Sequence, residues 1–231
     1  MDYWRQLDFY KPATNQLGKT LIVGCGATGS YVAYGLARMG VKDITICDHD
    51  IVEEHNLPNQ MFAESLFKPS DLKDGLIPKV YALQKTLAFM MPNTSITYIP
   101  QKVETLEPGR FNIIIQASDS MDVRKYVYNH YQDSALVLID PSTGGLFGNI
   151  YNIELGKRES LDYYKEYLNS SSISELPCTG RSIIDASMAI SAAVIQSFRT
   201  YAINRRWLVM HAFHDWKLGQ VLIMKTYKKE K

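Results

Sequence analysis

A glycine-rich segment near the start of the chain constrains the fold more than any other feature of the sequence. Residues 19–23, Lys-Thr-Leu-Ile-Val, form a short apolar run, typical of a buried strand. The run leads into Gly-Cys-Gly-Ala-Thr-Gly at 24–29, and helical apolar spacing follows over Ala27–Met39. Glycines here permit a tight turn, let the backbone approach a phosphate and seat the helix against the sheet. The segment therefore predicts the first strand, loop and helix of a nucleotide-binding fold.

Strands and helices alternate through the first 140 residues. Further strands are predicted at 43–47, 95–99, 112–116 and 136–140, and further helices at 78–91 and 121–132. This alternation predicts a parallel sheet that helices cover on both faces. Residues 53–77 are polar and are interrupted by Pro58, Pro69 and Gly75, so we expect a long functional loop there.

The pattern changes after Pro141. We predict an added antiparallel strand at 148–154, a tyrosine-rich helix at 161–168, a long apolar helix at 182–205 and a hairpin of strands at 207–213 and 220–225. The fold class is therefore α/β: a Rossmann-like, mostly parallel, doubly wound sheet with C-terminal antiparallel strands. We expect one domain over 1–231, with a nucleotide-binding half at 1–140. Because the helix at 182–205 is too apolar to lie exposed, we also expect a homodimer built in part from residues after Pro141.

The composition argues against several classes of protein. The chain has 25 basic and 24 acidic residues, a net charge of +1, so no electrostatic footprint for nucleic acid is present. The three cysteines, Cys25, Cys47 and Cys178, are widely spaced and form no C-x-x-C pair, which argues against a disulfide framework and a tetrathiolate zinc site. No apolar stretch reaches the roughly 18 residues that a membrane span needs. We expect a cytoplasmic protein without a membrane anchor.

Two acids follow the second predicted strand. Asp48 lies about where dinucleotide-binding folds place the acid that holds a ribose, roughly 20 residues beyond the glycine segment. A NAD-dependent oxidoreductase would explain the glycine segment and Asp48. It would leave the polar residues 56–60 without a role.

Residues 48–60 resemble a known family signature. Asp-His-Asp-Ile-Val-Glu at 48–53 and Asn-Leu-Pro-Asn-Gln at 56–60 resemble the pattern D-x-D-x-V-x-x-x-N-L-x-R-Q of the ThiF/MoeB/HesA family. The likeness continues in order with Gly-Leu-Ile-Pro-Lys at 75–79, Ala-Ser-Asp-Ser at 117–120 and Arg124, and with Trp-Arg-Gln at 4–6 and Pro-Cys-Thr at 177–179. Members of this family adenylate the C-terminal carboxylate of ubiquitin-like or sulfur-carrier proteins. The resemblance therefore implies ATP and Mg²⁺ as cofactors and a carrier protein ending in Gly-Gly as partner, bound by a carrier-binding and dimerisation half at 141–231.

The resemblance also implies roles for individual residues. The residues implied in nucleotide binding are Gly24, Gly26, Ala27, Thr28, Gly29, Asp48, Asp50, Asn56, Gln60 and Lys79. Among them Asp48 would hold the ribose, Lys79 would neutralise the phosphates, and Asn56 and Gln60 would bond the phosphates or the bound peptide. Asp119 would coordinate Mg²⁺, and Arg5 would reach a partner subunit's nucleotide. Each has an alternative: Asp50 fits catalysis or organisation of the following loop, Lys79 a surface lysine, and Asp119 a helix N-cap.

Two positions leave the activity open. Asn59 stands where the family has a catalytic arginine, which favours the alternative of a non-catalytic subunit in a heterodimer. Arg5 of a partner chain, or Lys68 or Lys73 of the same loop, would supply the missing charge. Cys178 matches a region where relatives carry a cysteine that forms a thioester or acyl-disulfide with the carrier; it fits that role or an ordinary loop thiol.

Overall fold

The computed structural model describes residues 2–68, 70, 75, 77–92, 94–170 and 183–228. Its strands form one sheet in the order β3-β2-β1-β4-β5-β6-β7-β8. Their bounds are β1 (Thr20–Val23), β2 (Ile44–Cys47), β3 (Ile96–Ile99), β4 (Ile113–Gln116), β5 (Val137–Gly144), β6 (Phe147–Glu154), β7 (Val209–Asp215) and β8 (Gln220–Thr226). The first five strands are parallel and the remaining pairs are antiparallel, so the predicted fold class is confirmed.

The carboxyl ends of the central strands lie side by side at one edge of the sheet. Val23 at the end of β1 is in register with Cys47 of β2 and with Gln116 of β4. The chain runs outward from β1 to β3 and then returns to β4 on the other side of β1. Ligands of open α/β sheets bind where the strand order reverses in this way, outside the carboxyl ends of the strands. The sheet therefore places its switch point between β1 and β4.

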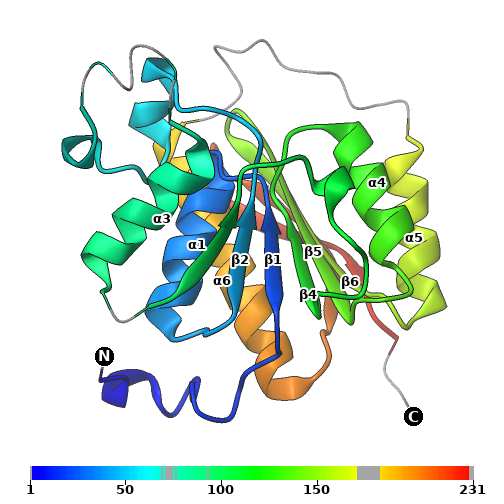
Figure 1. Cartoon of the computed structure of the whole chain (residues 1–231). Helices are drawn as coiled ribbons and strands as arrows, with labels where there is room; N and C mark the ends of the chain where they lie inside the picture. Colours follow the sequence, from blue (N-terminus) through cyan, green and yellow to red (C-terminus); the bar gives the residue numbers. More distant parts are fainter. Residues whose placement is uncertain are drawn as a thin grey trace.

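Helices cover both faces of the sheet, as predicted. Figure 1 shows α1 (Ala27–Met39), α3 (Lys79–Met90) and α6 (Ile184–Asn204) on one face, and α4 (Met121–Tyr131) and α5 (Arg158–Leu168) on the other. The 3₁₀ turns in the described residues are η1 (Trp4–Gln6), η2 (Glu54–Asn59), η3 (Glu64–Leu66) and η4 (Val103–Thr105). Two of these, η2 and η3, lie in the expected loop at 53–77. No helix in the described ranges is long and apolar enough to cross a bilayer.

The strand β5 is longer than predicted. We expected it to end at Asp140, yet it continues through Pro141 to Gly144, although proline is rare inside a sheet. Pairing with β4 ends at Ile139, and Pro141 is paired only with Ile150 of β6. On the β4 side, therefore, the missing N–H of Pro141 costs no ladder hydrogen bond.

The long helix α6 is buried mainly within its own chain. It packs against α1, β5 and β6, and Val194 and Phe198 are completely buried. The helix is thus covered within its own chain rather than exposed, and the expected homodimer stays a prediction. Apolar exposure is concentrated instead on the edge strand β8, where four consecutive side chains are about half exposed. These are Val221, Leu222, Ile223 and Met224.

Candidate functional site

The glycine segment forms a tight loop between β1 and α1. Gly24 has φ +91°, and a Cβ there would lie 2.8 Å from the backbone of Ala117 and Ser118. A side chain at Gly29 would collide with the carbonyl oxygen of Gly24, so close packing of the turn also requires this glycine. Gly26, the N-cap of α1, faces open space and provides no capping side chain. The first N–H groups of an α-helix have no intrahelical acceptors, and at the start of α1 no side chain caps them, an arrangement that suits an anion.

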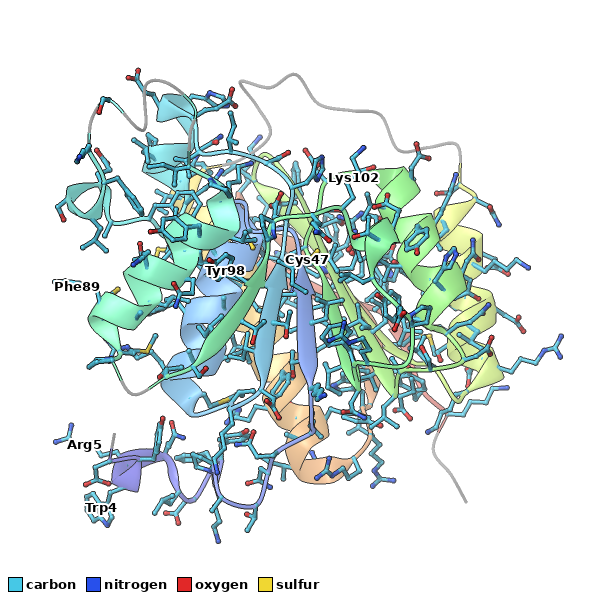
Figure 2. All side chains as sticks on the ribbon, in the orientation of Figure 1. Trp4, Arg5, Cys47, Phe89, Tyr98 and Lys102 are labelled. Atoms are coloured by element: carbon cyan, nitrogen blue, oxygen red, sulfur yellow. The ribbon has the colours of Figure 1, made fainter. Side chains whose placement is uncertain are left out.

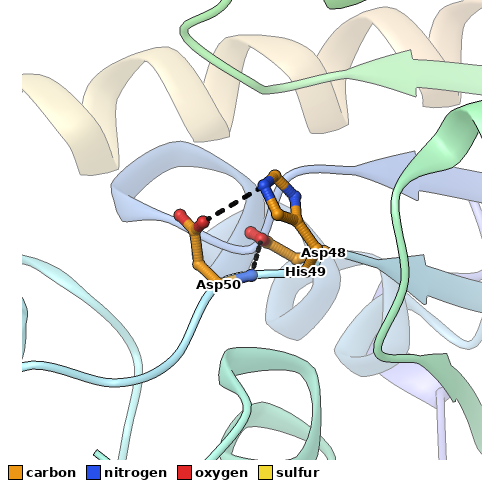
Figure 3. A group of neighbouring side chains, drawn as sticks. All are labelled: Asp48, His49 and Asp50. Carbon is orange, nitrogen blue, oxygen red and sulfur yellow. Dashed lines mark hydrogen bonds and ion pairs between the residues drawn. The ribbon is translucent and has the colours of Figure 1, made fainter.

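Asp48 ties the glycine loop to the carboxyl end of β2. Its Oδ2 accepts the backbone N–H of Cys25 at 2.7 Å, and its Oδ1 accepts the backbone N–H of Asp50 at 2.9 Å, which Figure 3 shows. A carboxylate has about four lone-pair positions, so both oxygens keep acceptor capacity for further donors. The side chain is half-buried at the loop. It is thus held in one place and still able to accept hydroxyl groups such as those of a ribose.

Asp50 and Lys79 form a pair that links the end of β2 to the start of α3. The Nζ of Lys79 lies 2.8 Å from Oδ2 of Asp50, and the backbone N–H of Lys79 donates to the Asp50 carbonyl at 2.9 Å. Lys79 is only 8% exposed, whereas the Asp50 side chain is 51% exposed. A buried cation is costly unless it is paired, so this is not the surface lysine that we considered as an alternative. These contacts join Asp50 to the first residue of α3, and its role in catalysis or in organising the loop stays a prediction.

Asp119 lies in the turn between β4 and α4. The backbone of this turn contacts Gly24, which places the turn beside the glycine loop. The N-cap of α4 is Ser120, whose hydroxyl accepts the N–H of Val123 at 3.3 Å. The alternative reading of Asp119 as the helix cap is therefore wrong, and its carboxylate is exposed at the edge where the nucleotide would bind.

The polar residues 56–60 form and end η2. Asn56 accepts the N–H of Glu53 through its side-chain oxygen at 3.2 Å, as half of a capping box. Asn59 and Gln60 are half-buried, and the side-chain carbonyl of Gln60 is buried without a hydrogen-bond partner. The side-chain carbonyl of Gln116, at the end of β4, is in the same condition. Unsatisfied buried oxygens are uncommon and accept donors readily.

Arg5 lies far from these residues within the chain. The N-terminal arm is fixed to the last turn of α1, where Gln6 Nε2 donates to the carbonyl of Met39 at 2.7 Å. A helix of this length separates that point from the glycine loop by about 20 Å, at ~1.5 Å per residue. Figure 2 accordingly shows Trp4 and Arg5 at the opposite end of the molecule from Lys102. The structure therefore does not bring Arg5 to the site of its own chain.

Comparison with known families decides what this arrangement belongs to. The model of the ThiF family matches residues 6–204. The chain belongs to the ThiF family. This match includes the glycine loop, the Asp50–Lys79 pair, the Asp119 turn and α6, and it begins at Gln6, just after Arg5.

Several relatives of the chain carry the names of activating enzymes or adenylyltransferases. The chain is 28% identical over 159 residues to ubiquitin-like modifier-activating enzyme 6 of Mus musculus, covering 63% of this chain and 14% of that protein. It is 26% identical over 184 residues to the sulfur carrier protein ThiS adenylyltransferase of Bacillus subtilis, covering 77% and 50%. Among solved structures, Escherichia coli MccB aligns with a TM-score of 0.67 at 14% identity, covering 94% of this chain and 65% of that one. The chain thus spans half or less of these two sequence relatives, and MccB shares the fold.

Two residues named in the sequence analysis, Cys178 and Lys73, lie outside the described residues. The other two cysteines, Cys25 and Cys47, are buried, and burial raises the pKa of the Cys47 thiol to about 12. The described residues thus provide no exposed thiol at the site.

The carboxylates of the site suit a hard cation. Within the described residues the one cluster with metal-ligand spacing is Asp48, His49 and Asp50, and Asp119 is not part of it. A magnesium ion at Asp119 would therefore take its other ligands from phosphate oxygens and water. That combination is the usual one for Mg²⁺ in nucleotide sites.

One group of buried residues behind the Asp119 turn escaped the sequence analysis. Arg124 pairs with Asp140, and Tyr164 of α5 donates to the other oxygen of Asp140 at 2.5 Å. Arg124 was recognised only as a motif position, and nothing in the sequence connected it with Asp140 or Tyr164. The available signal was an acid at the end of an apolar strand, a position that predicts a buried partner.

Proposed function

We propose that this chain uses ATP to adenylate the C-terminal glycine carboxylate of a ubiquitin-like or sulfur-carrier protein, with release of pyrophosphate. The observation that carries the proposal is the buried Lys79, held by Asp50 at the edge that the glycine loop and the Asp119 turn share. Support comes from membership of the ThiF family and from the names of its relatives, among them the ThiS adenylyltransferase. MccB, which has the same fold, has also been crystallised with ATP.

The reaction requires two anions to meet. An oxygen of the carrier carboxylate attacks the α-phosphorus of ATP, and a C(=O)–O–P linkage forms. The bond from the α-phosphorus to the α,β-bridging oxygen breaks, and pyrophosphate leaves with the electron pair. Charge neutralisation by fixed cations and N–H groups is the main way in which a protein lowers such a barrier.

Each side chain then has a defined task. The N–H groups at the start of α1 bind phosphate oxygens, and Asp48 accepts ribose hydroxyls while it holds the loop. Lys79 faces the phosphates, which compete with Asp50 for its ammonium group. Gln60 and Asn56 contribute amide groups from η2. Magnesium, when bound to Asp119, would polarise the phosphoryl oxygens and offset the charge of the leaving pyrophosphate.

Assembly is part of the proposal. Because Arg5 is exposed at the far end of α1, we place its functional contact in a second copy of the chain rather than in its own site. The exposed apolar residues of β8, with Leu208 and Leu218 nearby in sequence, provide surface for such an association or for the carrier. A solution mass equal to one chain at micromolar concentration would contradict the homodimer.

A second candidate function rests on Asn59. A neutral amide cannot replace the charge of the family arginine, and a non-catalytic subunit of a heterodimer would tolerate its loss. The oxidoreductase alternative is weaker, because hydride transfer gives no role to the buried Lys79 or to Asp119.

ATP–pyrophosphate exchange separates these readings. The assay uses the purified chain, MgATP, labelled pyrophosphate and a small candidate carrier protein ending in Gly-Gly. Exchange is expected with the free C-terminal carboxylate and not with the same carrier bearing a C-terminal amide. If MgATP raises the melting temperature but no exchange occurs, the non-catalytic reading holds; stabilisation by NADH alone would favour the oxidoreductase.

A further inference from the structure

A buried chain of polar contacts connects α5 to the turn that carries Asp119. Its members are Tyr164 on α5, Asp140 on β5 and Arg124 on α4. Asp140 and Tyr164 are completely buried, and Arg124 is 5% exposed. Burying charged groups costs free energy, so a buried ion pair is kept only when each charge is paired and hydrogen-bonded with good geometry.

The two ends of the Arg124 guanidinium have different partners. Nη1 pairs with Oδ1 of Asp140. Nη2 donates to the carbonyl of Ser118 at 2.8 Å and to the carbonyl of Pro141 at 3.2 Å. Arg124 thus fixes the residue immediately before Asp119, while Ser120, the residue immediately after it, is fixed as the cap of α4.

The orientation of Arg124 depends in turn on Asp140, and that of Asp140 on Tyr164. The Tyr164 hydroxyl donates to Oδ2 of Asp140 at 2.5 Å, while Oδ1 pairs with Arg124. Both oxygens of the carboxylate are therefore held by a partner, which fixes its orientation. Burial raises the pKa of Tyr164, and the hydroxyl therefore remains a donor over the working pH range. The relay reaches from a helix in the C-terminal part of the chain to the backbone carbonyl of Ser118, the residue before Asp119.

We infer that Tyr164 and Asp140 are positioning residues for Asp119, acting through Arg124 on the carbonyl of Ser118. The inference rests on the proposed function, in which Asp119 binds Mg²⁺. Residues that orient a metal ligand without touching the metal typically change metal affinity or activity by about 10- to 100-fold when they are altered. Because α5 lies in the half proposed to bind the carrier, a shift of α5 would also move the metal ligand.

The test compares two hydroxyl deletions at the same helix pair. Tyr164→Phe keeps the ring and removes the bond to Asp140. Tyr128→Phe is the matched control, since the Tyr128 hydroxyl bonds the Leu161 carbonyl at 3.3 Å, across the same α4–α5 contact, and takes no part in the relay. Arg124→Lys is the second variant: it keeps a cation near Asp140 but removes the forked guanidinium that also reaches Ser118.

Two measurements on the full chain give the outcome. The first is amide-hydrogen exchange over residues 117–124, and the second is the Mg²⁺ concentration that gives half of the thermal stabilisation by ATP. In Tyr164→Phe and Arg124→Lys we expect the Mg²⁺ midpoint to rise at least about tenfold, as for other metal-orienting residues. Amide exchange over residues 117–124 should become faster in both variants than in Tyr128→Phe. In Tyr128→Phe the amide-exchange rate and the Mg²⁺ midpoint should stay near the wild-type values, even if its melting temperature falls by as much as that of Tyr164→Phe.

The possible failures are distinct. If Tyr164→Phe matches Tyr128→Phe in amide exchange and in the Mg²⁺ midpoint, the inference is overturned. If wild type is not stabilised by MgATP, the proposed function fails, and amide exchange alone then decides whether the relay positions the turn. Should Tyr164→Phe not fold, Arg124→Lys gives the same comparison.

Discussion

The ammonium group of Lys79 lies 2.8 Å from the carboxylate of Asp50, and the two residues are joined a second time through their backbones. The double link fixes the first residue of α3 against the end of β2. It keeps a buried cation paired at the carboxyl end of the sheet. In the proposed function, this is the cation that the nucleotide phosphates would meet.

Lys79→Ala is expected to lower the rate of ATP–pyrophosphate exchange by about 100- to 1000-fold, since it removes a fixed cation from the developing phosphate charge. Asp119→Ala should lower it to a similar extent. Lys85→Ala, an exposed lysine on the same helix, serves as the control and should leave the rate unchanged. Equal rates for Lys79→Ala and Lys85→Ala would remove Lys79 from the mechanism.

Asp48→Asn should weaken both the fold and nucleotide binding. An amide supplies only one acceptor atom where two backbone N–H groups need one each, so we expect a loss of about 1–3 kcal/mol in the free energy of unfolding. Thermal stabilisation by ATP should disappear as well. Asp43→Asn, just before β2 at its other end, is the control, and urea unfolding with and without ATP is the measurement. Retained ATP stabilisation in Asp48→Asn would contradict the ribose role.

Asn59→Arg restores the charge that the family carries at this position. Exchange is expected to hold or to rise, because an added cation stabilises negative charge on the triphosphate. His55→Arg adds the same charge to an exposed position of η2 and should have no effect. A fall in rate for Asn59→Arg alone would indicate that the chain supplies this charge from elsewhere.

Cys178→Ser should not change ATP–pyrophosphate exchange. Thiol chemistry with the carrier can only follow the formation of the adenylate, so the first step does not need the sulfur. Any covalent adduct between the chain and the carrier should be lost in this variant, and mass spectrometry under non-reducing conditions would detect it. Loss of exchange in Cys178→Ser would place the residue in the adenylation site itself.

The buried His211 predicts a loss of stability at mildly acidic pH. Burial lowers the pKa of His211 to about 4, and its ring nitrogens contact Tyr163 and Asn149 at 2.9 Å each. The unfolded chain, with a pKa near 6.5, binds the proton more readily, so stability is full above about pH 6.5 and falls as the pH decreases toward 4. Between pH 7 and pH 5 we expect a loss of roughly 1–2 kcal/mol from this residue.

Urea unfolding at the two pH values tests this expectation. His211→Gln should be less stable at pH 7 but should lose less stability between pH 7 and pH 5 than wild type does. His55→Gln, an exposed histidine, should follow the wild-type pH dependence. An unchanged pH dependence in His211→Gln would show that the ring titrates normally.

Much of the structure of residues 1–140 was predictable because its information is local. The glycine loop, the helix after it and the strand that ends before Asp48 are each specified by residues close together in the sequence. Hydrophobic periodicity and glycine spacing reveal such local structure directly. The start of α5 was missed by three residues, at Arg158, because its first turn is polar and shows no apolar spacing. The extension of β5 through Pro141 was missed because it depends on where its neighbour β4 ends, which local sequence does not encode.

The contacts that could not be predicted join distant parts of the chain. The bond between Tyr164 and Asp140 spans 24 positions and exists only because α5 packs on the sheet beside α4. In the same way, the arm motif around Arg5 resembled a catalytic element, yet its location depends on contacts with the last turn of α1. Motifs identify the chemistry of such residues, whereas tertiary packing decides which site they serve.

The exposed strand β8 has a consequence for handling the protein. In the described part of the chain nothing pairs with its outer edge, and four apolar side chains lie along it. An open, apolar edge is a template onto which a strand of another molecule can add, the first step of aggregation. At high concentration the protein is therefore expected to aggregate through β8. Leu222→Lys should delay this aggregation, because it places a charge in the middle of the exposed edge.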